Sequence, residues 1–166
     1  NLKYTSINNE FLNDNKNVFI LKSIGKSYGV GGIRLGVLIS GDKKAIKEIG
    51  SNLPIWNINS VSENFLQIVQ KYDSEFKESC LQISDERQFL FKQLEKISFI
   101  EPYPSQANYI FCKVTDMDAE DLCVKMFSKF NIFIKLYDHK NFPNHIRISV
   151  RSGEDNSYLI NSLLSI

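Results

Sequence analysis

The feature that most constrains the fold of this sequence is a glycine-rich turn between two short aliphatic runs. Residues 18–23 and 34–40 are rich in β-branched and aliphatic side chains, and the stretch LKSIGKSYGVGGIRLG at 21–36 joins them. Such runs on either side of a glycine-rich turn predict two strands. The connection carries Lys26, which has a glycine before it and a serine after it, so little side-chain bulk prevents a ligand from approaching its amine.

Two side chains in the same stretch could bind an anion beside that amine. Ser23 precedes Lys26 by three residues and Arg34 follows it by eight. A hydroxyl and a planar guanidinium can converge on one phosphate, and an amine next to a bound phosphate is suited to imine chemistry. The Gly-Lys-Ser at 25–27 also matches the end of a P-loop, but the first glycine of that motif falls on Ile20, which excludes it. A surface lysine between two strands is the remaining alternative.

The stretch resembles the lysine segment of fold-type I pyridoxal-phosphate enzymes, in particular the class I/II aminotransferases near histidinol-phosphate aminotransferase and threonine-phosphate decarboxylase. The match is carried by Ser23, Lys26, Gly29, Gly32, Arg34 and Gly36. It departs at Gly25, where the family usually has a hydroxyl residue, so one expected phosphate donor is absent. The resemblance implies that Lys26 holds pyridoxal 5'-phosphate as an imine and transfers a proton, and that Ser23 and Arg34 bind the cofactor phosphate.

The same resemblance implies that part of the active site lies outside this sequence. The sequence begins at Asn1 without a methionine, and a complete fold-type I enzyme is more than twice as long, so we expect the C-terminal portion of a longer polypeptide. The N-terminal part would carry the loop that binds the phosphate at a helix N-terminus, an aromatic ring stacked on the pyridine and an aspartate paired with its nitrogen. Relatives build this site at a homodimer interface, so we also expect a homodimer.

The composition is that of an ordinary globular protein. The 166 residues are 43% hydrophobic and carry a net charge of +1, which fits one domain or a little more and provides no basic field for nucleic acid. There is no apolar run of about 18 residues and no signal-peptide pattern, so we expect a soluble, cytoplasmic protein without a membrane partner. The three cysteines and two histidines lack ligand spacing, which argues against a disulfide framework and a metal site.

The rest of the sequence alternates between strand and helix patterns. We expect a helix over 42–49, one long helix or two abutting helices over 61–97, strands over 107–114, 132–137 and 145–150, and helices that open at the capping signatures Thr115-x-x-Asp118 and Ser152-x-x-Asp155. This order predicts an α/β protein with a smaller mixed sheet in its second half. The resemblance implies that residues 1–54 form the C-terminal end of the large cofactor-binding domain and that residues 55–166 form the small C-terminal domain.

Two residues in the second half are candidates for substrate binding. Arg147 lies in a predicted strand, where its apolar neighbours point to one face and its own side chain to the other. The segment HIRISVRSGEDN resembles the family segment whose arginine binds the substrate carboxylate, and Arg147 falls on that arginine. Ser-Gln-Ala-Asn-Tyr at 105–109 resembles a Ser-x-Ala-Asn-Phe segment, which implies that Asn108 faces the substrate. A surface arginine and a strand-start asparagine that satisfies local backbone are the alternatives.

Two further positions bear on the substrate. Arg151 is similar to an arginine of the phospho-threonine decarboxylase branch and could contact a substrate phosphate, but a salt bridge with Glu154 or Asp155 is an equal alternative. At Lys135 relatives carry an arginine; lysine keeps the charge and loses the bidentate fork.

The predicted function is that of a pyridoxal-phosphate-dependent aminotransferase acting on an amino acid or phosphorylated amine, of the histidinol-phosphate type. A decarboxylase of a phospho-amino acid uses the same residues and stays open, because orientation of the substrate decides which bond is cleaved. A non-catalytic α/β module for binding or oligomerisation is the alternative from a different class.

Overall fold

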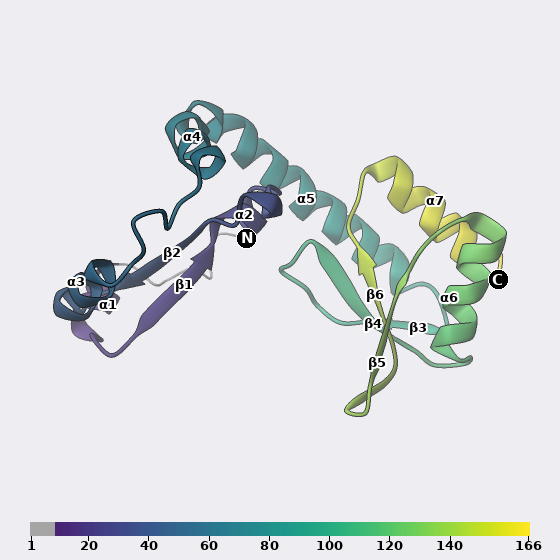
Figure 1. Cartoon of the computed structure of the whole chain (residues 1–166). Coiled ribbons are helices and arrows are strands. Elements are labelled where there is room, and N and C mark those ends of the chain that lie inside the picture. Colours follow the sequence, from purple (N-terminus) through teal and green to yellow (C-terminus); the bar gives the residue numbers. More distant parts are fainter. Residues whose placement is uncertain (1–8) are drawn as a thin grey trace. The chain divides into compact units, whose positions relative to one another are not determined.

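The computed structural model describes residues 9–166, so the first eight residues of the predicted first domain lie outside the described residues (Figure 1). Contacts along the chain divide it into two compact units, one ending at Lys77 and the other spanning Glu78–Ile166. The predicted domain boundary after residue 54 falls inside the first unit and stays a prediction. Helices and strands alternate in the chain, which confirms the α/β class.

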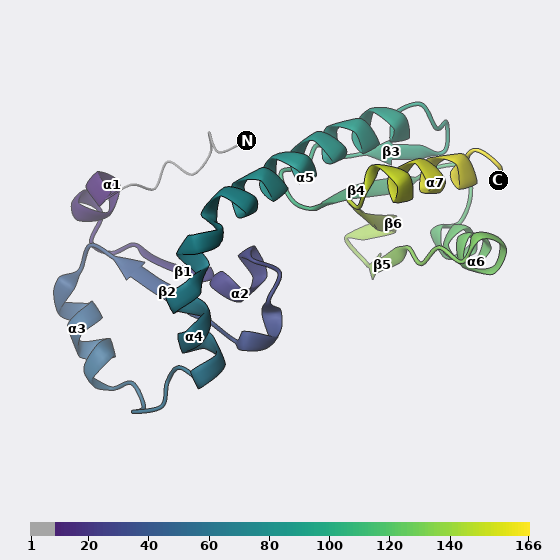
Figure 2. The same ribbon diagram turned by 90° about the horizontal axis from the view of Figure 1, so that it is seen from above.

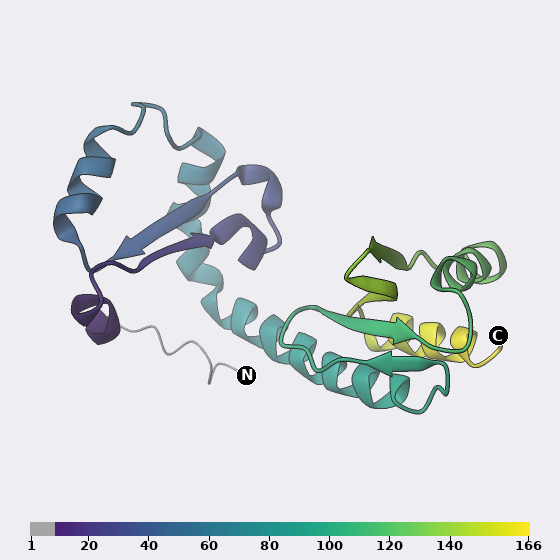
Figure 3. The same cartoon turned by 90° about the horizontal axis from the view of Figure 1, so that it is seen from below.

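The first unit is built around a two-stranded antiparallel ribbon. Its elements are α1 (Asn9–Asp14), β1 (Phe19–Ser23), α2 (Ile24–Ser27), the 3-10 turn η2 (Gly31–Ile33), β2 (Gly36–Ser40), α3 (Lys43–Ser51), α4 (Ser60–Ile68) and the 3-10 turn η3 (Val69–Tyr72). Phe19 pairs with Ser40 and Ser23 with Gly36, so both predicted strands are confirmed. Figure 3 shows the ribbon with α2 at its end. The lysine turn is therefore fixed by the register of two strands.

Side-chain caps set the start of the longer helices in this unit. The Asp42 carboxylate accepts a hydrogen bond from the Ala45 amide at 2.9 Å and opens α3. The Asn59 amide oxygen accepts from Ser62 N at 2.9 Å and opens α4. The predicted helical run of 61–97 is two helices, because η3 separates α4 from α5 (Asp73–Leu94).

The second unit is a four-stranded sheet with three helices packed on one face. Its further elements are β3 (Ile100–Pro102), β4 (Tyr109–Val114), α6 (Ala119–Phe130), β5 (Lys135–His139), β6 (Phe142–Ser149) and α7 (Gly153–Leu163). The strand order is β3-β4-β6-β5 and every pair is antiparallel. The predicted mixed sheet is therefore wrong, because β6 lies between β4 and β5 and separates the two strands that α6 connects.

One face of this sheet and the helices enclose the hydrophobic core. The fully buried side chains include Leu90, Leu94, Ile110, Cys112, Val114, Leu122, Met126, Ile146 and Leu163. They come from α5, α6, α7 and the two central strands, and Figure 2 shows α5 and α7 running side by side. The predicted strand at 132–137 is shifted to Lys135–His139, and Ile134 is buried in the core from the preceding loop.

Of the two helix caps predicted in this unit, one is confirmed and one lies at another residue. Ser152 caps α7 by accepting a hydrogen bond from the Asp155 amide at 3.2 Å, as predicted. The α6 cap is Asp118 and not Thr115, because the Asp118 carboxylate accepts from the amides of Glu120 and Asp121. A carboxylate has two acceptor oxygens and favours the positive end of the helix dipole, which makes it the stronger cap.

Candidate active site

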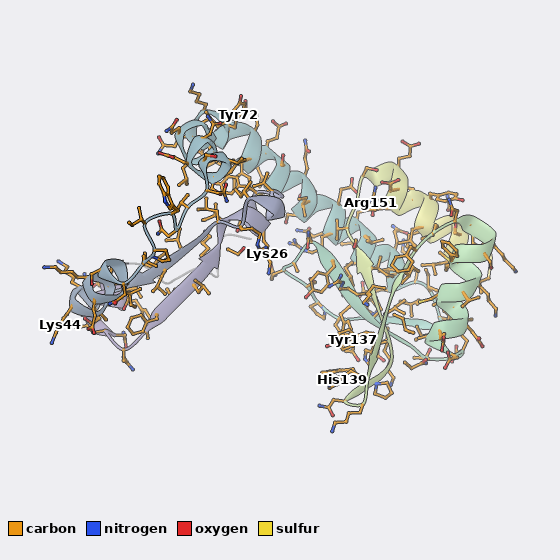
Figure 4. All side chains as sticks on the ribbon, viewed as in Figure 1. Lys26, Lys44, Tyr72, Tyr137, His139 and Arg151 are labelled. Carbon is orange, nitrogen blue, oxygen red and sulfur yellow. The ribbon has the colours of Figure 1, made fainter. Side chains whose placement is uncertain are left out.

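Lys26 lies in a one-turn helix and not in the open turn that the glycines predict. The helix α2 follows β1 directly, and Tyr28 N donates to Ile24 O at 3.1 Å while the Ser27 hydroxyl donates to Ser23 O at 3.1 Å. These bonds close the turn around Lys26, whose side chain is exposed. Figure 4 shows Lys26 on this helix at the end of the ribbon.

Gly25 is buried because the chain folds back closely over it. Its carbonyl accepts a hydrogen bond from Val30 N at 2.7 Å, and its amide donates to Leu35 O at 3.2 Å. A Cβ placed at Gly25 would lie 3.0 Å from Val30 O, closer than most real contacts of this kind. The departure from the family's hydroxyl residue therefore has a local cause: in this chain the turn over 30–33 occupies the space that a side chain at position 25 would need.

The turn after Lys26 is anchored on α4. Ile33 O accepts hydrogen bonds from Asn59 Nδ2 at 2.9 Å and from the buried Ser62 hydroxyl at 2.6 Å. The Tyr28 ring stacks on Phe76 with a centroid distance of 4.1 Å. These contacts fix both ends of the segment between Lys26 and Arg34.

Arg34 has a left-handed backbone conformation, with φ of 59°. Arginine rarely adopts this region, and a residue held there at a site is a sign of a constraint imposed by its surroundings. The Arg34 guanidinium lies 3.4 Å from Gly31 O, so it turns back over the loop that precedes it. Sequence reasoning could not have found this conformation, since only glycine and asparagine signal it.

Ser23, Lys26 and Arg34 line a single hollow of about 400 Å³. The rest of its lining comes from Leu21, Lys22, Gly25, Gly31, Leu35 and Gly36. The Ser23 hydroxyl makes no capping bond to α2, so it is not used by the helix that it precedes. An amine, a hydroxyl and a guanidinium around one hollow fit an aldehyde that carries a phosphate.

Arg147 lies on the sheet face opposite the core of the second unit. Its neighbours Ile146 and Ile148 are buried while Arg147 is exposed, which confirms the predicted alternation. The guanidinium carbon lies 5.1 Å from the centroid of the Tyr109 ring on β4, a cation–π distance. Lys135 on β5 is the cross-strand neighbour on the other side. The two cations thus stand next to each other on one face.

Asn108 directly precedes β4, and its carbonyl accepts a hydrogen bond from Val150 N at 2.9 Å. This contact belongs to its backbone, whereas the Asn108 side chain is exposed. Arg151 donates from Nε to the Asp155 carboxylate at 2.9 Å, and this hydrogen bond lowers the pKa of Asp155. The salt bridge that the sequence left as an alternative is therefore the contact that Arg151 makes.

An aromatic cluster on the same sheet face escaped the sequence analysis. It surrounds the buried His145 and consists of Tyr103, Phe111, Tyr137, His139 and Phe142. The imidazole Nδ1 lies 2.7 Å from Pro143 O and Nε2 lies 3.2 Å from the Tyr103 hydroxyl. Alternation of aromatic residues along 109–113 and 137–145 was the signal that could have revealed it. The cluster supports the strand that carries Arg147.

The predicted site residues thus form two groups, each within one unit: Ser23, Lys26 and Arg34 in the first, Asn108 and Arg147 in the second. Among the side chains that the structure describes, no three histidine, cysteine or acidic residues gather as a metal site. Over residues 9–166, no helix is long and apolar enough to cross a membrane.

Residues 2–163 match the family model described as aminotransferase class I and II, and the chain belongs to this family. Enzymes of the family use pyridoxal 5'-phosphate. The chain is 34% identical over 94% of its length to CMP-5'-(3-aminopropyl)phosphonate synthase of Streptomyces rubellomurinus, of which it spans 26%. It is 30% identical over its whole length to L-serine phosphate decarboxylase of Campylobacter jejuni, of which it spans 44%.

The fold is similar to that of solved aminotransferases. The crystal structure of the histidinol-phosphate aminotransferase from Clostridium acetobutylicum matches 98% of this chain with a TM-score of 0.82 and 25% identity. The match covers 50% of that chain. The chain therefore spans half or less of the length of these relatives, and the predicted fold, the C-terminal part of a fold-type I enzyme, is confirmed.

Proposed function

We propose that the protein containing this chain is a pyridoxal-phosphate-dependent aminotransferase of the histidinol-phosphate type, acting on an amino acid or phosphorylated amine. The observation that carries the proposal is the hollow lined by Ser23, Lys26 and Arg34. Within it, Lys26 provides the amine, and the other two side chains provide hydrogen-bond donors for one phosphate. When bound there, pyridoxal 5'-phosphate supplies an electron sink for the α-carbon of an amino substrate.

Each residue has a separate task in this proposal. Lys26 Nζ would hold the cofactor, and as a free amine it would take and return the proton of the substrate α-carbon. Ser23 and Arg34 anchor the phosphate. Arg147 binds the substrate carboxylate through its two-pronged guanidinium, with Asn108 as a second polar contact. The orientation that Arg147 imposes decides which bond of the α-carbon is broken.

The charges beside Arg147 favour a substrate with two anionic groups. Arg147 and Lys135 are opposite each other in register, and neither pairs with a carboxylate whose side chain the structure describes. Like charges directly opposite on a sheet destabilise it unless an anion lies nearby. A carboxylate together with a phosphate or phosphonate would satisfy both cations. Three relatives support this class of substrate: a phosphonate synthase, a serine phosphate decarboxylase and a histidinol-phosphate aminotransferase.

Decarboxylation of a phospho-amino acid is the second candidate, and the relative from Campylobacter jejuni favours it. The arginine that would contact the substrate phosphate in that branch is Arg151, which forms a salt bridge with Asp155. This salt bridge is exposed and weak, so it supports neither reaction over the other. We further propose that the protein acts as a homodimer in the cytoplasm and that the remainder of the polypeptide completes the site.

Reduction with borohydride tests the central assignment. The full-length protein is mixed with pyridoxal phosphate, reduced, digested and analysed by peptide mass spectrometry. We expect a covalent adduct on Lys26 that is absent from a Lys26→Arg variant. The exposed Lys22, which lines the same hollow, is the matched control residue. Adducts confined to Lys22 or other lysines would show that Lys26 is a surface lysine and that the module alternative holds.

A further inference from the structure

Arg87 is a buried cation that the proposed mechanism does not use. It lies on α5 and is 8% exposed, which makes it the one lysine or arginine that is buried among the side chains that the structure describes. Its Nη1 donates to Ala107 O at 3.3 Å and its Nη2 to the Ser84 hydroxyl at 3.2 Å. Both acceptors are neutral, and neither ion pair found in the described part of the chain includes Arg87.

Burying the Arg87 charge is unfavourable if the side chain serves packing alone. A buried charge without a charged partner costs free energy, and an apolar side chain of similar volume is often at least as stable in its place. The carboxylate of the neighbouring Glu86 is bonded elsewhere, because it accepts a hydrogen bond from Asn156 Nδ2 at 2.8 Å. Packing alone therefore gives no reason for an arginine at position 87.

The Arg87 guanidinium contacts the peptide group between Ala107 and Asn108. On the far side of this peptide, Asn108 O is fixed by Val150 N at 2.9 Å. On the near side, Ala107 N donates to the Ser105 hydroxyl at 3.1 Å. Arg87 supplies the remaining contact, to the carbonyl of Ala107. With these three bonds the backbone is held while the Asn108 side chain stays exposed.

The charge also acts on the peptide electronically. A cation at the Ala107 carbonyl oxygen polarises the peptide group, and the N–H of that group belongs to Asn108. A polarised N–H is a stronger donor to an anion. Tyr109, the next residue, lies under the Arg147 guanidinium. The peptide that Arg87 contacts is thus one residue away from the aromatic support of the proposed carboxylate-binding arginine.

We infer that Arg87 is a positioning residue, which fixes and polarises the Ala107–Asn108 peptide so that Asn108 meets the carboxylate end of the substrate. The inference rests on the proposed function, because it takes Asn108 as a substrate-binding residue. It adds a residue from α5 to a site otherwise built from β6 and the start of β4. It also explains why a charge is kept where an apolar side chain would pack.

The test compares Arg87→Met with Lys92→Met in the full-length protein loaded with pyridoxal phosphate. Lys92 is an exposed residue of the same helix, and its substitution by methionine removes the same charge. O-phospho-L-serine is titrated while the cofactor absorbance is recorded. We expect the apparent Kd to rise about tenfold in Arg87→Met, the effect of one charge-assisted hydrogen bond, with an unchanged spectrum before substrate is added. Lys92→Met should match the unmodified protein, and Arg87→Lys should recover part of the affinity because it keeps the charge.

Hydrogen exchange measured by mass spectrometry provides a readout that needs no substrate. Peptides covering 105–109 should exchange faster in Arg87→Met, while peptides of β6 should not change. An Arg87→Met protein that unfolds or loses its cofactor, and that Arg87→Lys does not rescue, would overturn the inference in favour of a structural role. Kd and exchange equal to those of Lys92→Met would also overturn it. A protein without a Lys26 adduct would overturn the proposed function first, and this inference with it.

Discussion

The two units of the chain differ in how much of their apolar surface they bury themselves. The core of the second unit is closed by its own helices and sheet. In the first unit, Leu21, Ile55 and Trp56 are 79%, 91% and 89% exposed, and the sheet has two strands. A two-stranded ribbon is marginally stable on its own. The proposed substrate-binding residues therefore lie on a scaffold that closes its own core, whereas Lys26 lies on one whose apolar surface needs further cover.

The largest expected effect concerns thiol reactivity, which tests whether the second unit is closed. Burial raises the pKa of the Cys112 thiol to about 12, so at pH 8 only about one molecule in 10⁴ carries the thiolate at this position. We expect iodoacetamide to modify the exposed Cys80 of the full-length protein and to leave Cys112 unmodified until denaturant is added. Peptide mass spectrometry measures both. Equal rates at the two cysteines would show that the core opens readily and would remove the contrast between the units.

The next prediction measures the stability of the closed core directly. Leu122→Ala removes a fully buried side chain and should lower the free energy of opening of the second unit by about 2 to 5 kcal/mol. Val124→Ala on the same helix is the control, since Val124 is exposed and should cost less than about 0.5 kcal/mol. Hydrogen exchange of β4 and α7 peptides reports the opening. A similar loss in both variants would mean that α6 does not pack as described.

Arg147→Ala separates substrate handling from cofactor handling. We expect the cofactor absorbance to be retained, because Arg147 belongs to the second unit and has no proposed task toward the cofactor. Binding of carboxylate-bearing amino acids should weaken by about 2 to 4 kcal/mol, the loss of a bidentate charge-assisted contact. Spectral titration with O-phospho-L-serine and with an amine that lacks a carboxylate checks this. If both ligands lose affinity equally, or the cofactor is lost, Arg147 is structural.

The smallest effect is expected at Arg34. Two variants separate the effect of its left-handed backbone from the effect of its guanidinium. Arg34→Lys keeps the left-handed strain and loses the fork, so cofactor affinity should fall by about 1 to 2 kcal/mol. Arg34→Gly should relieve the strain and lose the charge, giving weaker cofactor binding without a loss of thermal stability. Equilibrium dialysis and thermal unfolding measure the two quantities. Cofactor affinity that is unchanged in both variants would contradict a phosphate site at this position.

The local parts of the fold and site were readable in the sequence. The ribbon, the Ser152 cap and the grouping of Ser23, Lys26 and Arg34 all depend on residues close together in the chain. The features that the sequence did not predict depend on contacts between residues far apart in the chain, or on a conformation that the residue type does not indicate. The order of β4, β6 and β5 depends on pairing across a helix, and the contact of Arg87 with Ala107 spans 20 residues. The conformation of Arg34 has no signal in its residue type.

The central place of β6 in the sheet decides which of its residues can be substituted without loss of the fold. Residues 145–147 of β6 are paired with strands on both sides, so a slip by one residue would bury the Arg147 charge and expose Ile146 and Ile148. The register is therefore locked by the core face. Single substitutions on the open face, at positions 147, 135 or 109, can accordingly change the charge and shape of that face without disturbing the interior. Under the proposed function, the anion preference of the second unit could therefore change through single substitutions that leave its core intact.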